Sequence, residues 1–117
     1  MIDRDRFVLY HGRSNEEVQD CREYVKIWWS EEMAARLEIA DQVCENKFIF
    51  NLPWDMEQIA EIVAFGEALD WTYMPGKDVE FVYQMNRHRY WVCLGQAYAI
   101  TGRERYVKTF VSQMADW

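Results

Sequence analysis

An amide, a guanidinium and an imidazole follow one another at Asn86-Arg87-His88. A guanidinium can hold a carboxylate or a sulfate through two parallel hydrogen bonds. An imidazole has an ordinary pKa of about 6.5, so His88 can bind an acidic group or transfer a proton near neutral pH. The Asn86 amide can face a polar ligand as donor and acceptor. These three residue types predict a binding site for an acidic ligand.

Each of these side chains also has a structural interpretation. Asn86 falls on an apolar helical stripe, where an amide can tie neighbouring helices together. Arg87 can form an ion pair with Glu80 or Asp78, which precede it on the same predicted helix. A lone histidine on a packed helix is more often structural than functional. The sequence leaves both interpretations open for all three residues.

Aromatic side chains are a second candidate for binding. Trp54 and Trp71 lie in a segment without helical periodicity, where binding residues often occur. An indole face can support the C–H face of a sugar ring while polar groups at its rim reach the hydroxyls. Each of these two tryptophans can line a sugar subsite or pack in the core like the other large rings. The other four fall at helical spacing and are expected to pack in the core or between helices: Trp28, Trp29, Trp91 and Trp117.

Other groups with potential chemistry have simpler interpretations. Asp78 and Glu80 could be the paired carboxylates of a glycoside hydrolase, but acids at a helix start are better explained by the helix dipole and by pairing with Arg87. His11 has no supporting context. The three cysteines form an odd set without CxxC spacing, so we expect no disulfide framework and no zinc site. No cofactor and no metal are expected.

The first 46 residues are expected to hold a pair of helices that follow a short apolar patch at residues 7–10. Ser14 and Glu17 have the spacing of a capping box, which marks a helix start. The helix after it carries one apolar stripe at spacings of three and four. Ser30 resembles a second N-cap. Either two helices meet near Ser30 or one long helix runs through it.

Residues 47–76 are predicted to be an irregular segment with one or two short strands. Residues 47–53 have extended character and end at a proline. Residues 61–65 are rich in β-branched side chains and are followed by Gly66. The segment ends at the turn-forming pair Pro75-Gly76.

Residues 77–117 are predicted to form a helical hairpin. One long helix is expected from residue 79 to residue 100, because this stretch contains no proline and is apolar on most of its circumference. Gly102 suits the left-handed position that ends a helix. The last helix, over residues 106–117, has a strongly apolar face that needs a partner. It therefore predicts either a fragment of a larger protein or a chain that associates with another.

The bulk composition excludes several classes of protein. The chain has 117 residues, enough for one domain, and 50% hydrophobic with 16% aromatic residues excludes a disordered chain. A net charge of −7 argues against binding to nucleic acid and to anionic membranes. The first seven residues are too charged for a signal peptide, and no apolar run approaches the length of a membrane span.

An ordered set of motifs runs from residue 48 to the last residue. In chain order they are Phe48-Ile49-Phe50, Leu52-Pro53-Trp54-Asp55, Asp70-Trp71, Pro75, Asp78-Val79-Glu80, Gln84-Met85-Asn86-Arg87-His88-Arg89-Tyr90-Trp91, Leu94-Gly95-Gln96-Ala97-Tyr98, Thr101-Gly102-Arg103-Glu104-Arg105-Tyr106 and Gln113-Met114-Ala115-Asp116-Trp117. The set resembles the N-terminal helical region of the heparinase II/III-like polysaccharide lyases, which include heparinase III. Residues 1–47 fit this region only loosely. Arg103 departs from the family pattern, in which an aspartate is usual.

The resemblance implies a mainly α fold, with helical hairpins forming part of an incomplete α/α toroid and a short β excursion near residues 47–76. It implies β-elimination of uronate-containing polysaccharides such as heparan sulfate or alginate. In that reaction a tyrosine or histidine removes the C5 proton and a tyrosine donates to the leaving oxygen. The catalytic asparagine, tyrosine and histidine of the family are expected outside these 117 residues.

Two hypotheses follow. The first is the N-terminal fragment of a periplasmic or secreted polysaccharide lyase, inactive alone, which binds an acidic polysaccharide such as a glycosaminoglycan through Asn86, Arg87, His88, Trp71 and Trp54. The second is a stand-alone helical binding or interaction module without catalysis. Under the first, the partners are the polysaccharide and the remainder of the enzyme, and the apolar last helix predicts self-association. Nucleic acid and membrane are not expected as partners.

Overall fold

The computed structural model describes residues 14–53, 55 and 57–117. Trp54, His11 and the apolar patch at residues 7–10 lie outside the described residues. The chain divides into two compact units, of which the first ends at Met33 and the second runs from Ala34 to Trp117. Each unit is treated by itself.

The first unit contains helix α2 (Asn15–Trp28) and the start of helix α3 (Ser30–Cys44). The predicted capping box is confirmed, because the Ser14 hydroxyl accepts from the Glu17 amide at 3.2 Å and the Glu17 carboxylate accepts from the Ser14 amide at 2.7 Å. The two-helix alternative is the correct one. Trp29 leaves the helical conformation at φ −131°, and Ser30 is the first residue of α3 rather than its N-cap. No residue of α2 is buried.

A small antiparallel sheet opens the irregular segment of the second unit. Strand β1 (Lys47–Phe50) pairs with strand β2 (Ile59–Ala64), with Phe48 opposite Val63 and an irregularity before Phe50. Side chains alternate across a strand, so Phe48 and Phe50 both point to the same buried face. The prediction of short strands between residues 47 and 76 is confirmed. The segment ends in a single 3-10 turn, η1 (Pro75–Lys77).

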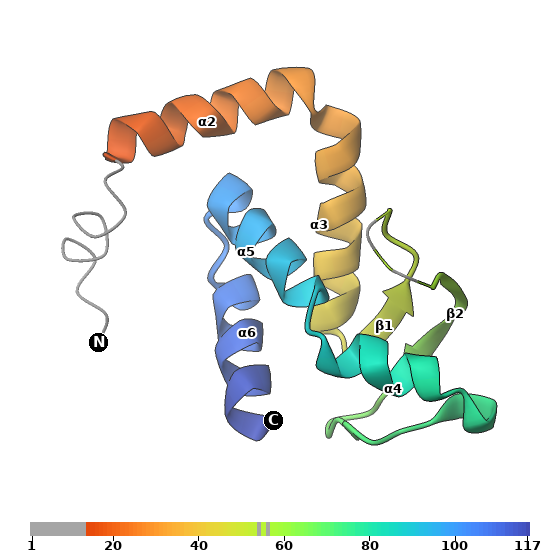
Figure 1. Cartoon of the computed structure of the whole chain (residues 1–117). Helices are drawn as coiled ribbons and strands as arrows, with labels where there is room; N and C mark the ends of the chain where they lie inside the picture. The colour runs from red at the N-terminus through yellow and green to blue at the C-terminus, as the bar shows by residue number, and fades with distance from the viewer. Residues whose placement is uncertain (1–13, 54, 56) are drawn as a thin grey trace. The chain divides into compact units, whose positions relative to one another are not determined.

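Three helices follow: α4 (Val79–Asn86), α5 (Tyr90–Thr101) and α6 (Glu104–Asp116). The prediction of one helix from residue 79 to residue 100 is wrong, because a turn at Arg87–Arg89 separates α4 from α5 and His88 adopts φ 53°. No proline or glycine marks this break. We attribute the break to packing, because four aromatic rings contact the His88 ring at this turn, as described below. Helix α5 ends at Gly102 with φ 68°, as predicted, and packs beside α6 (Figure 1).

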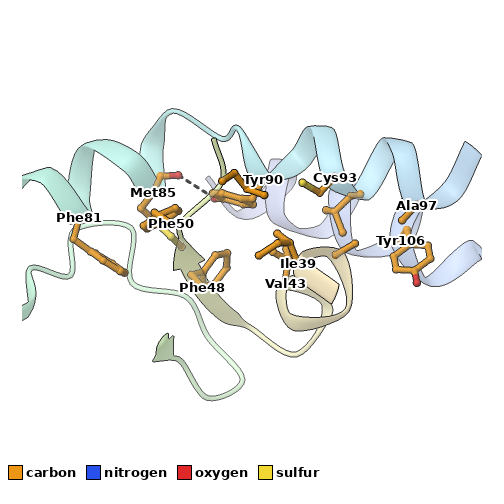
Figure 2. Packing of buried hydrophobic residues seen from close by; sticks show 13 residues of the cluster. Ile39, Val43, Phe48, Phe50, Phe81, Met85, Tyr90, Cys93, Ala97 and Tyr106 are labelled. Atoms are coloured by element: carbon orange, nitrogen blue, oxygen red, sulfur yellow. Dashed lines mark hydrogen bonds between the residues drawn. The ribbon is translucent and has the colours of Figure 1, made fainter. Parts of the chain in front are cut away.

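The hydrophobic core of this unit lies between β1 and the helices (Figure 2). The Phe48 and Tyr90 rings meet edge to face at 5.0 Å, and the Phe50 and Phe81 rings do so at 5.3 Å. One face of β1 therefore holds the start of α5 and the start of α4. Ile39 and Val43 of α3 complete this layer. The predicted mainly α architecture with a helical hairpin and a short β excursion is confirmed. None of the helices in the described part of the chain is long and apolar enough to cross a membrane.

Candidate functional site

Aromatic rings from three segments surround the imidazole of His88. The Trp91 ring stacks on it with centroids 3.9 Å apart and planes inclined by 13°. The rings of Trp117, Trp71 and Tyr90 approach at steep angles, with centroids at 4.8, 5.6 and 6.0 Å. We call these five residues the His88 box. It joins the α4–α5 turn to the end of α6 and to the irregular segment.

Each of the three tryptophans of the His88 box has its indole N–H satisfied by a side chain. Trp71 donates to the Asp116 carboxylate at 2.9 Å, and Trp91 donates to the Gln113 amide oxygen at 2.9 Å. Trp117 donates to the Asn86 amide oxygen, also at 2.9 Å. An indole N–H that is wholly or partly removed from water usually finds such a partner. The last turns of α6 therefore fix the positions of the rings around His88.

Asn86 is bonded on both sides of its amide. Its nitrogen donates to the carbonyl oxygens of Trp71 at 2.8 Å and Val82 at 2.9 Å, while its oxygen accepts from Trp117. The geometry matches the structural interpretation, in which an amide ties separate elements together. Both amide protons are already used within the chain, so a contact of Asn86 with a sugar would run through the residues that it positions.

Arg87 turns away from the box along α4. Its Nη1 atom lies 2.6 Å from the Glu80 carboxylate, and its guanidinium sits 6.0 Å from the centroid of the Tyr83 ring. The Asp78 carboxylate caps α4 by accepting from the Glu80 amide at 3.0 Å. The expectation that these acids serve the helix and Arg87 is confirmed. A guanidinium has five N–H donors, so the ion pair leaves others for an anion.

His88 combines a strained backbone with a covered ring. A φ of 53° is uncommon for a residue other than glycine and persists where the surroundings fix it. Its Nδ1 atom lies 3.3 Å from the Tyr90 hydroxyl oxygen, and its Nε2 atom is buried without a hydrogen-bond partner among the described residues. Burial in the aromatic surroundings lowers the pKa of His88 because it disfavours the charged ring.

The predicted site residues are thus only partly brought together. Trp71, Asn86 and His88 converge, while Arg87 is engaged at the side of α4. Trp54 lies outside the described residues. Sequence reasoning assigned Trp91 and Trp117 to packing alone and missed that both contact His88. The spacing of three between His88 and Trp91 was the available signal for the first of these contacts.

Outside the His88 box, three cysteines are the other reactive groups in the described part of the chain. The described residues contain no group of histidine, cysteine and acidic side chains that could hold a metal ion. Cys21 is exposed, Cys44 half-buried and Cys93 buried, and all three are free thiols. Burial raises the pKa of the Cys93 thiol to about 11, so it is a poor nucleophile near neutral pH.

Comparison with known proteins agrees with this architecture. A model of the family described as heparinase II/III N-terminus matches residues 7–117. The chain belongs to the heparinase II/III N-terminal family.

Individual relatives match over shorter stretches. A heparin-sulfate lyase from Bacteroides stercoris is 40% identical over 53 residues, and one from Pedobacter heparinus is 34% identical over 53 residues. Each alignment covers 45% of this chain and 8% of the relative. A solved structure of a heparinase III gene product with methylated lysines matches 96% of this chain and 18% of its own chain, with a TM-score of 0.57 and 22% identity. That likeness supports the fold. The chain thus spans a small part of the length of these proteins.

Proposed function

We propose that this chain is the N-terminal part of a polysaccharide lyase that cleaves a uronate-containing polysaccharide by β-elimination. The family membership over residues 7–117 supports this proposal, and two relatives carry the name heparin-sulfate lyase. The chain contributes wall and substrate contacts to the groove of an α/α toroid completed by other parts of the enzyme. By itself it is inactive, because the groups that move protons in the elimination lie elsewhere.

The convergence of Trp71, Asn86 and His88 on one side of the α4–α5 turn carries the proposal for a binding role. Two features of this place suit a sugar. Trp117 is 63% exposed and offers an apolar face, and the imidazole of His88 beside it supplies a polar group. Binding sites for small polar molecules combine such apolar faces with a few fixed polar groups.

Arg87 supplies the charge that an acidic polysaccharide requires. The whole chain is acidic, with a net charge of −7, so a polyanion must be attracted locally. The Glu80 carboxylate holds the guanidinium in place and also neutralises part of its charge. We infer that Arg87 meets a uronate carboxylate or a sulfate at the edge of the groove, while the aromatic rings meet the sugar face. Heparan-like and alginate-like polymers both fit this description.

The proposal extends to location and assembly. Such polymers lie outside the cytoplasm, so we propose a periplasmic or secreted enzyme. The α6 surface leaves large apolar side chains exposed, with Val111 at 50% and Met114 at 49%. An exposed apolar face of this kind supports association with the remainder of the enzyme or with a second copy of the chain.

The test measures lyase activity in the 117-residue chain and in a longer protein from the same reading frame. β-Elimination creates an unsaturated uronate, which is followed by its ultraviolet absorbance on heparan sulfate and on alginate. The longer protein is expected to form this product and the 117-residue chain to form none. Product from the 117-residue chain would refute the assignment of catalysis to other segments. A longer protein that binds either polymer without cleaving it would indicate a binding module instead.

A further inference from the structure

The hydrogen bonds around Tyr90 determine which nitrogen of His88 carries the proton. The Tyr90 hydroxyl donates to the carbonyl oxygen of Met85 at 3.0 Å (Figure 2, dashed line). A hydroxyl has a single proton, so it has none left for the Nδ1 atom of His88, 3.3 Å away. Nδ1 must therefore be the donor of that pair. In the neutral ring, Nε2 is then a hydrogen-bond acceptor.

This acceptor has no partner within the described residues. Nε2 is buried, and native proteins pair most buried polar atoms with protein or with an ordered water. The surrounding residues also hold the imidazole in one orientation. The strained backbone at φ 53°, the stacked Trp91 ring and the edge of Trp117 all hold the ring in this place.

We infer that the Nε2 atom of His88 is an acceptor site for a hydroxyl group, filled by an ordered water in the free chain and by a sugar hydroxyl when a saccharide binds. A carboxylate cannot fill it, because a carboxylate has no proton to donate at neutral pH. This divides the roles within the site: His88 recognises a hydroxyl, and the charged group of the sugar falls to Arg87. The claim that a sugar hydroxyl binds Nε2 rests on the proposed function. The claim that a water binds there in the free chain does not.

In this proposal a saccharide approaches the imidazole from the side of Trp117. Trp71 and Trp91 are half-buried residues, whereas Trp117 is 63% exposed. The hydrogen bond to Asn86 holds the Trp117 ring edge-on to the imidazole, with centroids 4.8 Å apart. In this proposal the saccharide displaces the Trp117 ring, while the stacked Trp91 ring stays on the imidazole.

Nitrogen NMR of the 117-residue chain tests the inference directly. The chain has only two histidines, so a His11→Gln variant assigns the signals of His88. At pH 7 we expect Nδ1 to be protonated and Nε2 to be unprotonated in long-range proton–nitrogen spectra. A protonated Nε2, whether in the other tautomer or in an imidazolium, would overturn the inference.

The source of the hydroxyl is resolved in two further measurements. A titration with an unsulfated heparosan tetrasaccharide is expected to move the Nε2 signal, which assigns the site to a sugar hydroxyl. If the signal stays in place, a water seen at hydrogen-bond distance from Nε2 in a high-resolution crystal structure assigns the site to water alone. Absence of both donors overturns the inference. Saccharide binding that leaves Nε2 unaffected would preserve the proposed function while removing His88 from it.

Two matched substitutions separate a specific acceptor from general packing. His88→Asn keeps an amide donor near the place of Nδ1 and tolerates a positive φ, but it has no atom at the place of Nε2. His88→Gln reaches that place with an amide oxygen. We expect tetrasaccharide affinity to fall about fivefold in His88→Asn, the equivalent of one neutral hydrogen bond, and to change less than about twofold in His88→Gln. Equal losses of affinity in the two variants would overturn the claim that a sugar hydroxyl binds Nε2.

Discussion

The indole nitrogen of Trp117 and the amide oxygen of Asn86 lie 2.9 Å apart, although the two residues are 31 positions apart in the sequence. This bond ties the end of α6 to the end of α4. The same Asn86 amide donates to the backbone of Trp71, so one side chain connects three segments around His88. Loss of that amide should therefore loosen the whole His88 box rather than one contact.

Replacing Asn86 with alanine is expected to lower the free energy of unfolding by about 1–3 kcal/mol, because it leaves the Trp71 carbonyl and the Trp117 indole without their partner. Chemical denaturation measures the change, and tryptophan fluorescence reports the release of the Trp117 ring. Asn51→Ala, at an exposed position, is the matched control and should change stability by less than about 0.5 kcal/mol. Equal stability of both variants would show that Asn86 is not a structural link.

Removal of the Tyr90 hydroxyl tests the hydrogen bond that it makes with the Nδ1 atom of His88. Tyr90→Phe keeps the ring that packs on Phe48 but leaves the Met85 carbonyl and the His88 Nδ1 atom without this partner. We expect a loss of about 1–2 kcal/mol in the free energy of unfolding, and a change in the His88 nitrogen signals. Tyr83→Phe is the control, since Tyr83 is 56% exposed. An unchanged His88 spectrum in Tyr90→Phe would contradict the assignment of the tautomer.

The lowered pKa of His88 predicts a stability that depends on pH in a defined direction. Burial places the pKa of the folded state below the value of about 6.5 in the unfolded chain, so the unfolded chain binds more protons between the two. The contribution of neutral His88 is complete above about pH 6.5 and is lost as the pH falls through the folded pKa. Tyr90 is the other titratable group in direct contact with the His88 ring, and burial raises its pKa, so it keeps its proton throughout this window.

Denaturation of the wild-type chain and of His88→Gln across pH 5 to 8 isolates this effect. Subtracting the two curves removes the carboxylates that both proteins share. The wild type should lose stability relative to the variant as the pH falls below about 6.5. A difference that is flat with pH, or that rises on acidification, would show that folding does not disfavour the charged imidazole.

Much of the fold follows from local sequence signals. The capping box at Ser14 and Glu17, the two short strands and the glycine that ends α5 were all predicted from residues within a few positions of one another, and all are present. Such signals act through the backbone of their own element. The break at His88 was not predictable in this way. His88 contacts Trp117 and Trp71, which are distant in sequence, as well as its neighbours Tyr90 and Trp91, and no proline or glycine at residues 87–89 marks a break.

The candidate site shows the same division. The residue types at Asn86, Arg87 and His88 indicated a site, but whether each faces a ligand or a neighbour depends on partners that the spacing does not reveal. Arg87 found its predicted partner Glu80 because both lie on one helix. Asn86 accepts a hydrogen bond from Trp117, which is 31 positions away, and no sequence pattern within α4 predicts this partner.

Two glycines allow a matched test of backbone conformation in the hairpin. Gly102 adopts φ 68° at the end of α5, while Gly95 lies inside α5, and in both cases an added Cβ would meet no atom within 4 Å. A methyl group therefore fits at both positions, and the two positions differ only in backbone conformation. Gly102→Ala should destabilise the chain by about 1–2 kcal/mol because an L-residue is strained in the left-handed region. Gly95→Ala should stabilise it by about 0.5–1 kcal/mol because alanine favours a helix. Thermal denaturation gives both signs, and a loss of stability in Gly95→Ala would mean that another segment approaches α5 at this position.

The ion pair of Arg87 gives the sharpest test of a binding role. The Glu80 carboxylate lies 2.6 Å from Nη1 of the guanidinium, so Glu80→Gln should free charge for a sulfate or carboxylate, whereas Arg87→Ala should remove it. We expect the affinity for a heparan sulfate oligosaccharide, measured by calorimetry, to rise about threefold in Glu80→Gln and to fall about tenfold in Arg87→Ala. A tenfold change corresponds to about 1.4 kcal/mol of binding free energy. Both effects should shrink at high salt, because screening weakens exposed charges.

The control is Arg103→Ala, which removes an exposed cation at the start of α6 and should alter affinity little. Equal losses in Arg87→Ala and Arg103→Ala would mean that the polyanion responds to overall charge, and the guanidinium of Arg87 would then have no special place in the groove.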